Sequence, residues 1–150
     1  MAYEIRHTRR VQFHETDAAG IIFFANYFKW MDEMEGEFFR SLNLPGPLVD
    51  HWGATGKYNY DWTVVKATCE YKKIVVFDDV IETHVWVKRK GTKSLTFTFS
   101  FSKNGEEVAR GEKIDCCTSG LGDAHKGIPL PDYIAQRIEQ APWETAEAGR

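Results

Sequence analysis

A carboxylate in a short loop just ahead of a helix is the feature of this sequence best suited to chemistry. Asp17 is followed by two alanines, by Gly20 and by an apolar run over residues 21–25 that leads into Asn26. Unpaired backbone N–H groups and the helix dipole favour negative charge at a helix start. A substrate carbonyl that points there would have its developing oxyanion stabilised, and a nearby carboxylate could attack that carbonyl or activate water.

A thioester suits this arrangement, because its carbonyl is more electrophilic than that of an ester and its thiolate is a good leaving group. One carboxylate and an oxyanion hole can then suffice. The alternative is that Asp17 only caps a turn, and the residue types alone do not decide between the two. The sequence contains neither a G-x-S-x-G nucleophile elbow nor an H-E-x-x-H zinc motif, which argues against those hydrolytic sites.

One long helix and a group of strands are expected to position this loop. Apolar side chains recur at steps of three and four over residues 27–42, which predicts a helix with Asn26 as its N-cap and residues 44–47 as its end. In the second half of the chain the period changes to two, and Asn104-Gly105 is a strong hairpin signal. The expected elements are strands over 4–14, 63–71, 80–90, 94–102 and 107–118 and a short terminal helix over 131–140. This order predicts the α+β class, with one helix on an antiparallel sheet.

The segment around Asp17 resembles the signature of the 4-hydroxybenzoyl-CoA thioesterase family. The family pattern is an Asp, two small residues or Pro-Ala, a Gly, an apolar run and then Asn-Tyr, and this sequence reads DAAGIIFFANY from residue 17. The resemblance covers roughly residues 5–120, and the VARG stretch over 108–111 is similar to the last long strand of the family. It implies a hotdog fold, a curved antiparallel sheet wrapped around one long helix. The chain is then a single domain over 1–150, with a frayed tail at about 144–150.

The resemblance also implies catalytic roles. Asp17 matches the catalytic carboxylate, as nucleophile or general base, and the backbone N–H of Phe24 matches the oxyanion donor. Gly20 would let the loop pass close to the thioester. Several relatives carry a His near position 24, where this chain has Phe23 and Phe24, so a mechanism that needs only the Asp is favoured. The resemblance further places Arg89, Lys90 and Lys93 where basic residues of the family bind the phosphates of CoA.

The acyl group is expected to be hydrophobic, because aromatic residues just after the loop can form a flat apolar slot. These residues are Phe23, Phe24, Tyr27 and Trp30. An aromatic, hydroxybenzoyl-like acyl-CoA is favoured, and Asp32 is a candidate partner for a hydroxyl on its ring. The predicted function is hydrolysis of this acyl-CoA to the free acid and CoA. Alternatives are a thioesterase for medium-chain acyl-CoA or acyl-carrier protein, and a non-catalytic acyl-CoA-binding hotdog protein; a hotdog dehydratase would need the missing His.

Composition narrows the possible partners and location. The net charge of −3 argues against nucleic-acid binding, and no apolar run approaches the roughly 20 residues of a membrane span. The first ten residues are polar and lack the apolar core of a signal peptide, so a cytoplasmic location is expected. Three cysteines form no disulfide framework or zinc pattern, and neither a metal nor a cofactor is expected.

The assembly is expected to be a homo-oligomer. A single sheet around one helix leaves long strand edges that need cover. Pairing two sheets edge to edge would bury those edges and shape a pocket between subunits. The sequence therefore predicts a dimer or, more specifically, a tetramer built from dimers.

Overall fold

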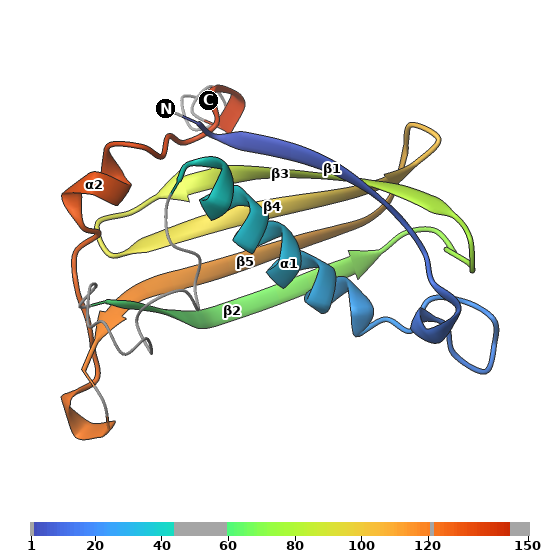
Figure 1. Ribbon diagram of the computed structural model, residues 1–150, viewed down its shortest axis with the longest axis horizontal. Coiled ribbons are helices and arrows are strands. Elements are labelled where there is room, and N and C mark those ends of the chain that lie inside the picture. Colours follow the sequence, from blue (N-terminus) through green and yellow to red (C-terminus); the bar gives the residue numbers. More distant parts are fainter. Residues whose placement is uncertain (1, 44–59, 121, 145–150) are drawn as a thin grey trace.

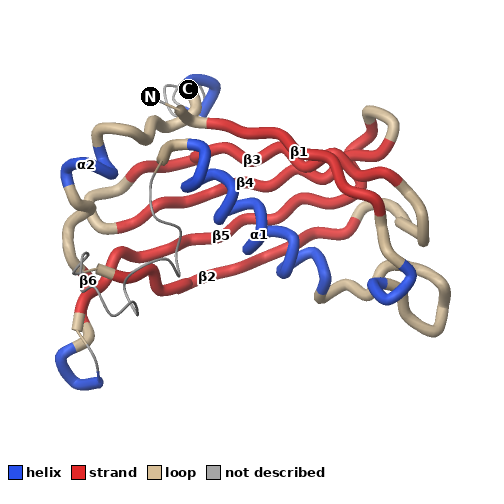
Figure 2. The backbone as a smooth tube through the Cα atoms, viewed as in Figure 1, coloured by secondary structure: helices blue, strands red, loops and turns tan. Residues whose placement is uncertain are grey.

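The fold is an antiparallel sheet that lies behind a long helix (Figures 1 and 2). A computed structural model describes residues 2–43, 60–120 and 122–144. The elements are β1 (Glu4–Arg10), α1 (Asn26–Ser41), β2 (Asp61–Tyr71), β3 (Val80–Lys90), β4 (Ser94–Lys103), β5 (Glu106–Ser119), β6 (Lys126–Gly127), α2 (Asp132–Ala135) and two 3-10 turns, Phe13–Glu15 and Gly122–Ala124. The strand order is β1-β3-β4-β5-β2 with antiparallel neighbours, and β6 pairs with β5. This arrangement confirms the predicted α+β class and hotdog fold.

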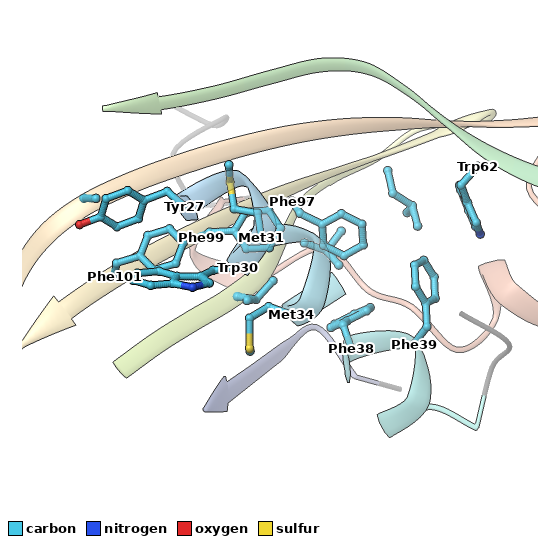
Figure 3. Packing of buried hydrophobic residues seen from close by; sticks show 14 of the residues in the cluster. Tyr27, Trp30, Met31, Met34, Phe38, Phe39, Trp62, Phe97, Phe99 and Phe101 are labelled. Atoms are coloured by element: carbon cyan, nitrogen blue, oxygen red, sulfur yellow. The ribbon is translucent and has the colours of Figure 1, made fainter. Parts of the chain in front are cut away.

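The alternating pattern of β4 places its large apolar side chains on the face that meets α1. Leu95, Phe97, Phe99 and Phe101 are fully buried, as the sequence predicts. Phe38 of α1 packs edge-on against Phe97, with ring centroids 5.2 Å apart (Figure 3). Burial of each such side chain contributes about 1.5–3 kcal/mol relative to exposure. This core fixes the helix, and with the helix it fixes the loop at its start. From α1 the core receives Tyr27, Trp30, Met31, Met34, Phe38 and Phe39.

The helix crosses β5 at a glycine. A Cβ atom on Gly111 would lie 2.3 Å from Sδ and 3.2 Å from Cε of Met31, at the end of a flexible side chain, so a larger residue there would force the Met31 side chain to move. Glycine inside a strand commonly marks such a close approach. Gly111 therefore leaves room for the Met31 side chain between α1 and β5.

The start of α1 differs from the prediction, because Ala25 and not Asn26 is its N-cap. The Asn26 side chain donates from Nδ2 to the carbonyl of Glu15, 2.7 Å away. Its amide group is therefore tied to the preceding loop and does not cap the helix that it begins.

Two other boundaries are shorter than predicted. The first strand ends at Arg10, because Phe13–Glu15 wind into a 3-10 turn, and the terminal helix shrinks to Asp132–Ala135. The expected helix stop at 44–47 and the tail beyond residue 144 lie outside the described residues. All three cysteines are free thiols, as expected. No helix in the described ranges is both long and apolar enough to span a bilayer.

Strand β2 forms one edge of the sheet, and within the described part of the chain only β5 pairs with it. Its pairing with β5 is irregular between Val64 and Lys66. Val64 and Val65 are 49% and 61% exposed, which is unusual for valines in a strand. The β2 edge is thus a row of free backbone groups flanked by exposed apolar side chains.

Candidate active site

Residues 16–22 form a narrow turn that presents Asp17. Thr16 bridges to Ile22, the Asp17 N–H donates to the Ile21 carbonyl at 2.8 Å, and the Gly20 N–H donates to the Asp17 carbonyl at 2.9 Å. Gly20 has a φ of +80°, which favours glycine, while a Cβ there would meet nothing within 4 Å. Backbone conformation, and not crowding inside this chain, explains the glycine.

The Asp17 carboxylate is held at one end and open at the other. Its Oδ1 accepts the Ala19 N–H at 2.8 Å, and the residue is exposed. Its second oxygen has no hydrogen-bond partner in the ranges that the structure describes. The side chain therefore caps its own turn, as the simpler hypothesis proposes, and still offers one oxygen to a substrate.

The start of α1 carries unpaired backbone donors. The Phe23 N–H donates to the Glu15 carbonyl at 2.9 Å, and the Asn26 N–H to the Phe23 carbonyl at 2.9 Å. Between them, the N–H groups of Phe24 and Ala25 donate to no acceptor among the described residues. Such donors at the positive end of a helix dipole form a site for an anion or a developing oxyanion.

A mostly apolar pocket of about 350 Å³ opens beside this helix start. The burial of Tyr27 raises the pKa of its hydroxyl, which therefore stays protonated. Burial likewise raises the pKa of the nearby Cys69 thiol, to about 11, so this cysteine is a poor nucleophile. The two lysines at the pocket, Lys72 and Lys73, pair with glutamates of β5. The lining residues are Ile21, Ile22, Phe24, Tyr27, Tyr71, Lys72, Lys73, Ile74 and Val75.

The four aromatic residues of the predicted slot do not form one wall in this chain. Phe23 and Phe24 are 45% and 58% exposed, whereas Tyr27 and Trp30 are 2% and 1% exposed. Phe24 and Tyr27 line the pocket. Trp30 packs against Tyr27 and Phe101 in the core (Figure 3). Trp30 therefore lies behind the site and supports it.

The basic residues predicted to bind CoA lie far from Asp17 within the chain. The turn between β3 and β4 is at the opposite end of the sheet from the loop before α1 (Figure 1). An 11-residue strand such as β3 is about 36 Å long. Lys90 donates to the carbonyls of Ala135 and Ile138, at 2.9 and 3.0 Å, and so holds the C-terminal segment. Arg89 and Lys93 are exposed.

Two groups of buried charges were missed by sequence reasoning. One is Glu15, whose carboxylate contacts Arg9 and Trp30. Glu15 and Trp30 are 15 residues apart, so no local sequence pattern predicts the contact between them. In the second group, the burial of Lys113 and Asp115 could have been read from the alternating β5 pattern, in which both occupy inward positions, although their contact with Glu35 could not.

The second group lies between α1 and β5. Glu35, Asp115 and Lys113 are 0%, 1% and 7% exposed. The Lys113 ammonium contacts the Glu35 carboxylate and lies 3.8 Å from Asp115 and 3.5 Å from the exposed Asp32. Burial raises the pKa of Glu35, and Asp115 adds to this rise. Burial alone would lower the pKa of Lys113, but the surrounding carboxylates raise it, so the lysine stays charged.

Comparison with known proteins gives a consistent set of matches. The model of the thioesterase superfamily matches residues 19–109. A protein of Aquifex aeolicus (strain VF5), provisionally named an esterase, is 40% identical over 101 residues, which cover 67% of this chain and 73% of that protein. The 4-hydroxybenzoyl-CoA thioesterase of Pseudomonas sp. (strain CBS-3) is 27% identical over 142 residues, covering 89% and 97%. The structure of a gentisyl-coenzyme A thioesterase is similar with a TM-score of 0.73 at 27% identity, covering 87% and 99%.

Proposed function

Since this chain belongs to the thioesterase superfamily and is a thioester hydrolase, we propose that it hydrolyses an aromatic acyl-CoA to the free acid and CoA. The observation that carries this proposal is an exposed carboxylate, Asp17, on a turn next to a helix start with unpaired N–H groups. Two of its relatives are named for hydroxylated aromatic acyl groups, 4-hydroxybenzoyl and gentisyl.

In the proposed reaction the substrate carbonyl oxygen lies at the N–H groups of Phe24 and Ala25. As general base, the free oxygen of Asp17 takes a proton from water, the hydroxide attacks the carbonyl, and the C–S bond breaks as the thiolate takes the proton. As nucleophile, Asp17 attacks the carbonyl carbon, the C–S bond breaks to release the thiolate, and a mixed anhydride forms. Water then hydrolyses the anhydride, which regenerates Asp17 and releases the acid, and the thiolate takes the proton that this step sets free. Both routes consume one water and release one acid and one thiol. The helix start stabilises the negative charge that develops on the carbonyl oxygen.

The pocket beside the helix start supports a hydrophobic acyl group. Its volume of about 350 Å³ is within the usual range of ligand pockets, and Phe24 and Tyr27 offer ring faces. Ile21 and Ile74 would suit an aliphatic chain as well, so a medium-chain acyl group is the alternative.

We further propose that two copies of the chain complete the site by pairing through β2. The loop that carries Asp17 lies toward the β2 edge, and the basic β3–β4 turn lies at the other end of the sheet (Figure 1). A two-fold axis that is perpendicular to the sheet and lies just outside the midpoint of the β2 edge pairs the two β2 strands antiparallel. It also moves the partner subunit's Arg89 and the partner subunit's Lys93 to the end that holds Asp17. A tetramer would be formed from two such dimers.

A panel of acyl-CoA substrates tests the proposal. Release of free CoA is followed with a thiol reagent for benzoyl, hydroxybenzoyl, phenylacetyl, hexanoyl and acetyl-CoA. The expected order of kcat/KM places aromatic groups first, then hexanoyl, then acetyl. A preference for acetyl-CoA would refute the hydrophobic pocket, and no release from any substrate would favour a binding protein.

The basic turn is tested on the same assay. Replacing Arg89 and Lys93 with alanine is expected to raise KM with little change in kcat, the sign of lost uniform binding. The effect shrinks at high salt because exposed charges are screened. A fall in kcat at unchanged KM contradicts the assignment, as does a monomer in sedimentation at micromolar concentration.

A further inference from the structure

We infer that Glu15 is a positioning residue that holds the Asp17 turn and the first N–H groups of α1 in one fixed geometry. The inference rests on the proposed function for its catalytic meaning. Glu15 is 6% exposed and lies behind the turn, so it does not face a substrate. Its role follows from the elements that its atoms join.

The carboxylate of Glu15 receives a donor on each oxygen. Oε1 accepts the Gln12 N–H at 2.8 Å. Oε2 accepts the Arg9 guanidinium at 3.0 Å and the Trp30 indole N–H at 2.7 Å. One side chain thus connects the end of β1, the 3-10 turn and the second turn of α1.

The backbone carbonyl of Glu15 makes a second set of contacts. It accepts the Phe23 N–H at 2.9 Å and the Asn26 side-chain amide at 2.7 Å. Phe23 directly precedes Phe24, whose N–H is the proposed oxyanion donor, and Asp17 is two residues beyond Glu15. Both catalytic groups are therefore attached to the same anchored residue.

The partners of Glu15 are themselves fixed. The Arg9 guanidinium lies 4.3 Å from the centroid of the Trp30 ring and also pairs with the exposed Glu33 at 2.6 Å. Trp30 is 1% exposed and packs on Tyr27 in the core (Figure 3). Glu15 therefore connects the exposed loop that carries Asp17 to side chains that are fixed in the core.

The substitution Glu15→Gln tests this role with little change in shape. A glutamine has one acceptor oxygen and one amide nitrogen, so either orientation places N–H against an N–H donor from Gln12, Arg9 or Trp30. Since a misplacement of about 1 Å can cost on the order of 10²-fold, kcat is expected to fall by about 10–10²-fold, with KM within about threefold. Glu33→Gln is the matched control, because it removes the exposed partner of the same Arg9 and should leave kcat within about twofold.

Amide hydrogen exchange gives a readout that does not depend on turnover. In folded Glu15→Gln, the amides of Asp17, Gly20 and Phe23 should exchange faster than in the wild type, while amides of β4 should not change. Unchanged kcat together with unchanged exchange overturns the inference. Loss of kcat with unchanged exchange also overturns it, because the turn would then be held without Glu15.

A second variant keeps the test decisive if Glu15→Gln does not fold. Trp30→Phe removes the indole donor to Glu15 and retains an aromatic ring, so exchange at Asp17 should rise and kcat should fall by several-fold. If neither changes, the inference fails. If the wild type hydrolyses no thioester, the proposed function fails separately, and the exchange rates alone still decide whether Glu15 holds the turn.

Discussion

Two glutamates are buried against the same helix, and their surroundings differ. Glu15 lies under the first turns of α1, where its two oxygens accept three N–H donors. Glu35 lies on α1 itself, where Lys113 reaches one oxygen and Asp115 is close by. The first carboxylate has donors for both oxygens, whereas the second shares a single cation with another buried acid. Both side chains are buried to a similar extent, so the two glutamates differ mainly in the number of hydrogen-bond donors around them.

The Glu35 group has fewer hydrogen-bond donors than acceptors among the described residues. Oε1 of Glu35 and both oxygens of Asp115 have no hydrogen-bond partner among the residues that the structure describes. A proton on Glu35 would supply one further donor, and burial together with Asp115 raises the pKa of Glu35. Lys113 opposes this rise without cancelling it. We infer that Glu15 holds a geometry next to the proposed site, while the raised pKa of Glu35 favours its protonated form and makes its contribution to stability depend on pH.

The largest expected effect is on kcat and comes from substitution of Asp17, which lies on the turn that Glu15 is inferred to hold. Asp17→Asn should lower kcat by about 10²–10⁴-fold, because asparagine can neither take a proton nor attack a thioester. Its amide oxygen can still accept the Ala19 N–H, so the melting temperature should stay close to that of the wild type. The measurement is kcat by thiol release together with thermal unfolding. Activity within threefold of the wild type would remove Asp17 from the mechanism.

The next largest effect is expected on the free energy of unfolding, when the cation that pairs with Glu35 is removed. Lys113→Met leaves two buried acids without a cation, which should cost about 3–5 kcal/mol, or on the order of 10 °C in melting temperature. The control is Lys88→Met, because Lys88 is exposed and pairs with Glu112 at 2.7 Å; its loss should cost less than about 1 kcal/mol. Equal losses in the two variants would show that the Glu35 group contributes no more than a surface pair.

The sequence predicts what depends on local pattern and misses what depends on distant contacts. The strand period placed Phe97 and Phe99 in the core, and the short motif singled out Asp17. The contact of Glu35 with Lys113 joins residues 78 positions apart, so no local pattern contains it. The separation of Arg89 from Asp17 likewise follows from the antiparallel pairing of β1 with β3, which sets Val80 opposite Arg10 and leaves Arg89 near the far end of β3; the sequence pattern left this pairing open.

A smaller effect should appear in the pH dependence of stability. Because the pKa of Glu35 is raised above its ordinary value of 4.5, the folded protein keeps a proton that the unfolded chain releases above that pH. The stabilising contribution is full below pH 4.5 and is lost as pH rises toward the folded pKa, by at most about 1.4 kcal/mol per pH unit. Glu35→Gln cannot lose a proton, so it should match the wild type near pH 4.5 and exceed it at higher pH. Urea unfolding between pH 4.5 and 8 measures this, and a parallel profile would contradict the proton on Glu35.

The smallest effect is the pH dependence of stability that Glu107 contributes, and its sign is opposite to that of Glu35. Glu107 is partly exposed and accepts several hydrogen bonds. Burial alone would raise the pKa of Glu107, but hydrogen bonds from Arg110, Lys72 and Ser100 lower this pKa to about 2. Its contribution is therefore present above pH 4.5 and is lost as pH falls toward 2. Glu107→Gln should lower the free energy of unfolding by about 1–2 kcal/mol at pH 7. It should also reduce the further loss of stability as pH falls from 4.5 to 2.

The control for Glu107 is its neighbour on the same strand. Glu106 is more exposed and, among the residues that the structure describes, pairs only with Lys73, at 3.1 Å. Glu106→Gln should therefore leave the stability nearly unchanged both at pH 7 and below pH 4.5. Urea unfolding from pH 7 down to pH 2 compares the two variants with the wild type. If donors govern these acids, Glu107 and Glu35 should titrate in opposite directions although both lose hydration on folding. A Glu107→Gln profile parallel to that of the wild type below pH 4.5 would show that the hydrogen bonds from Arg110, Lys72 and Ser100 do not lower the pKa of Glu107.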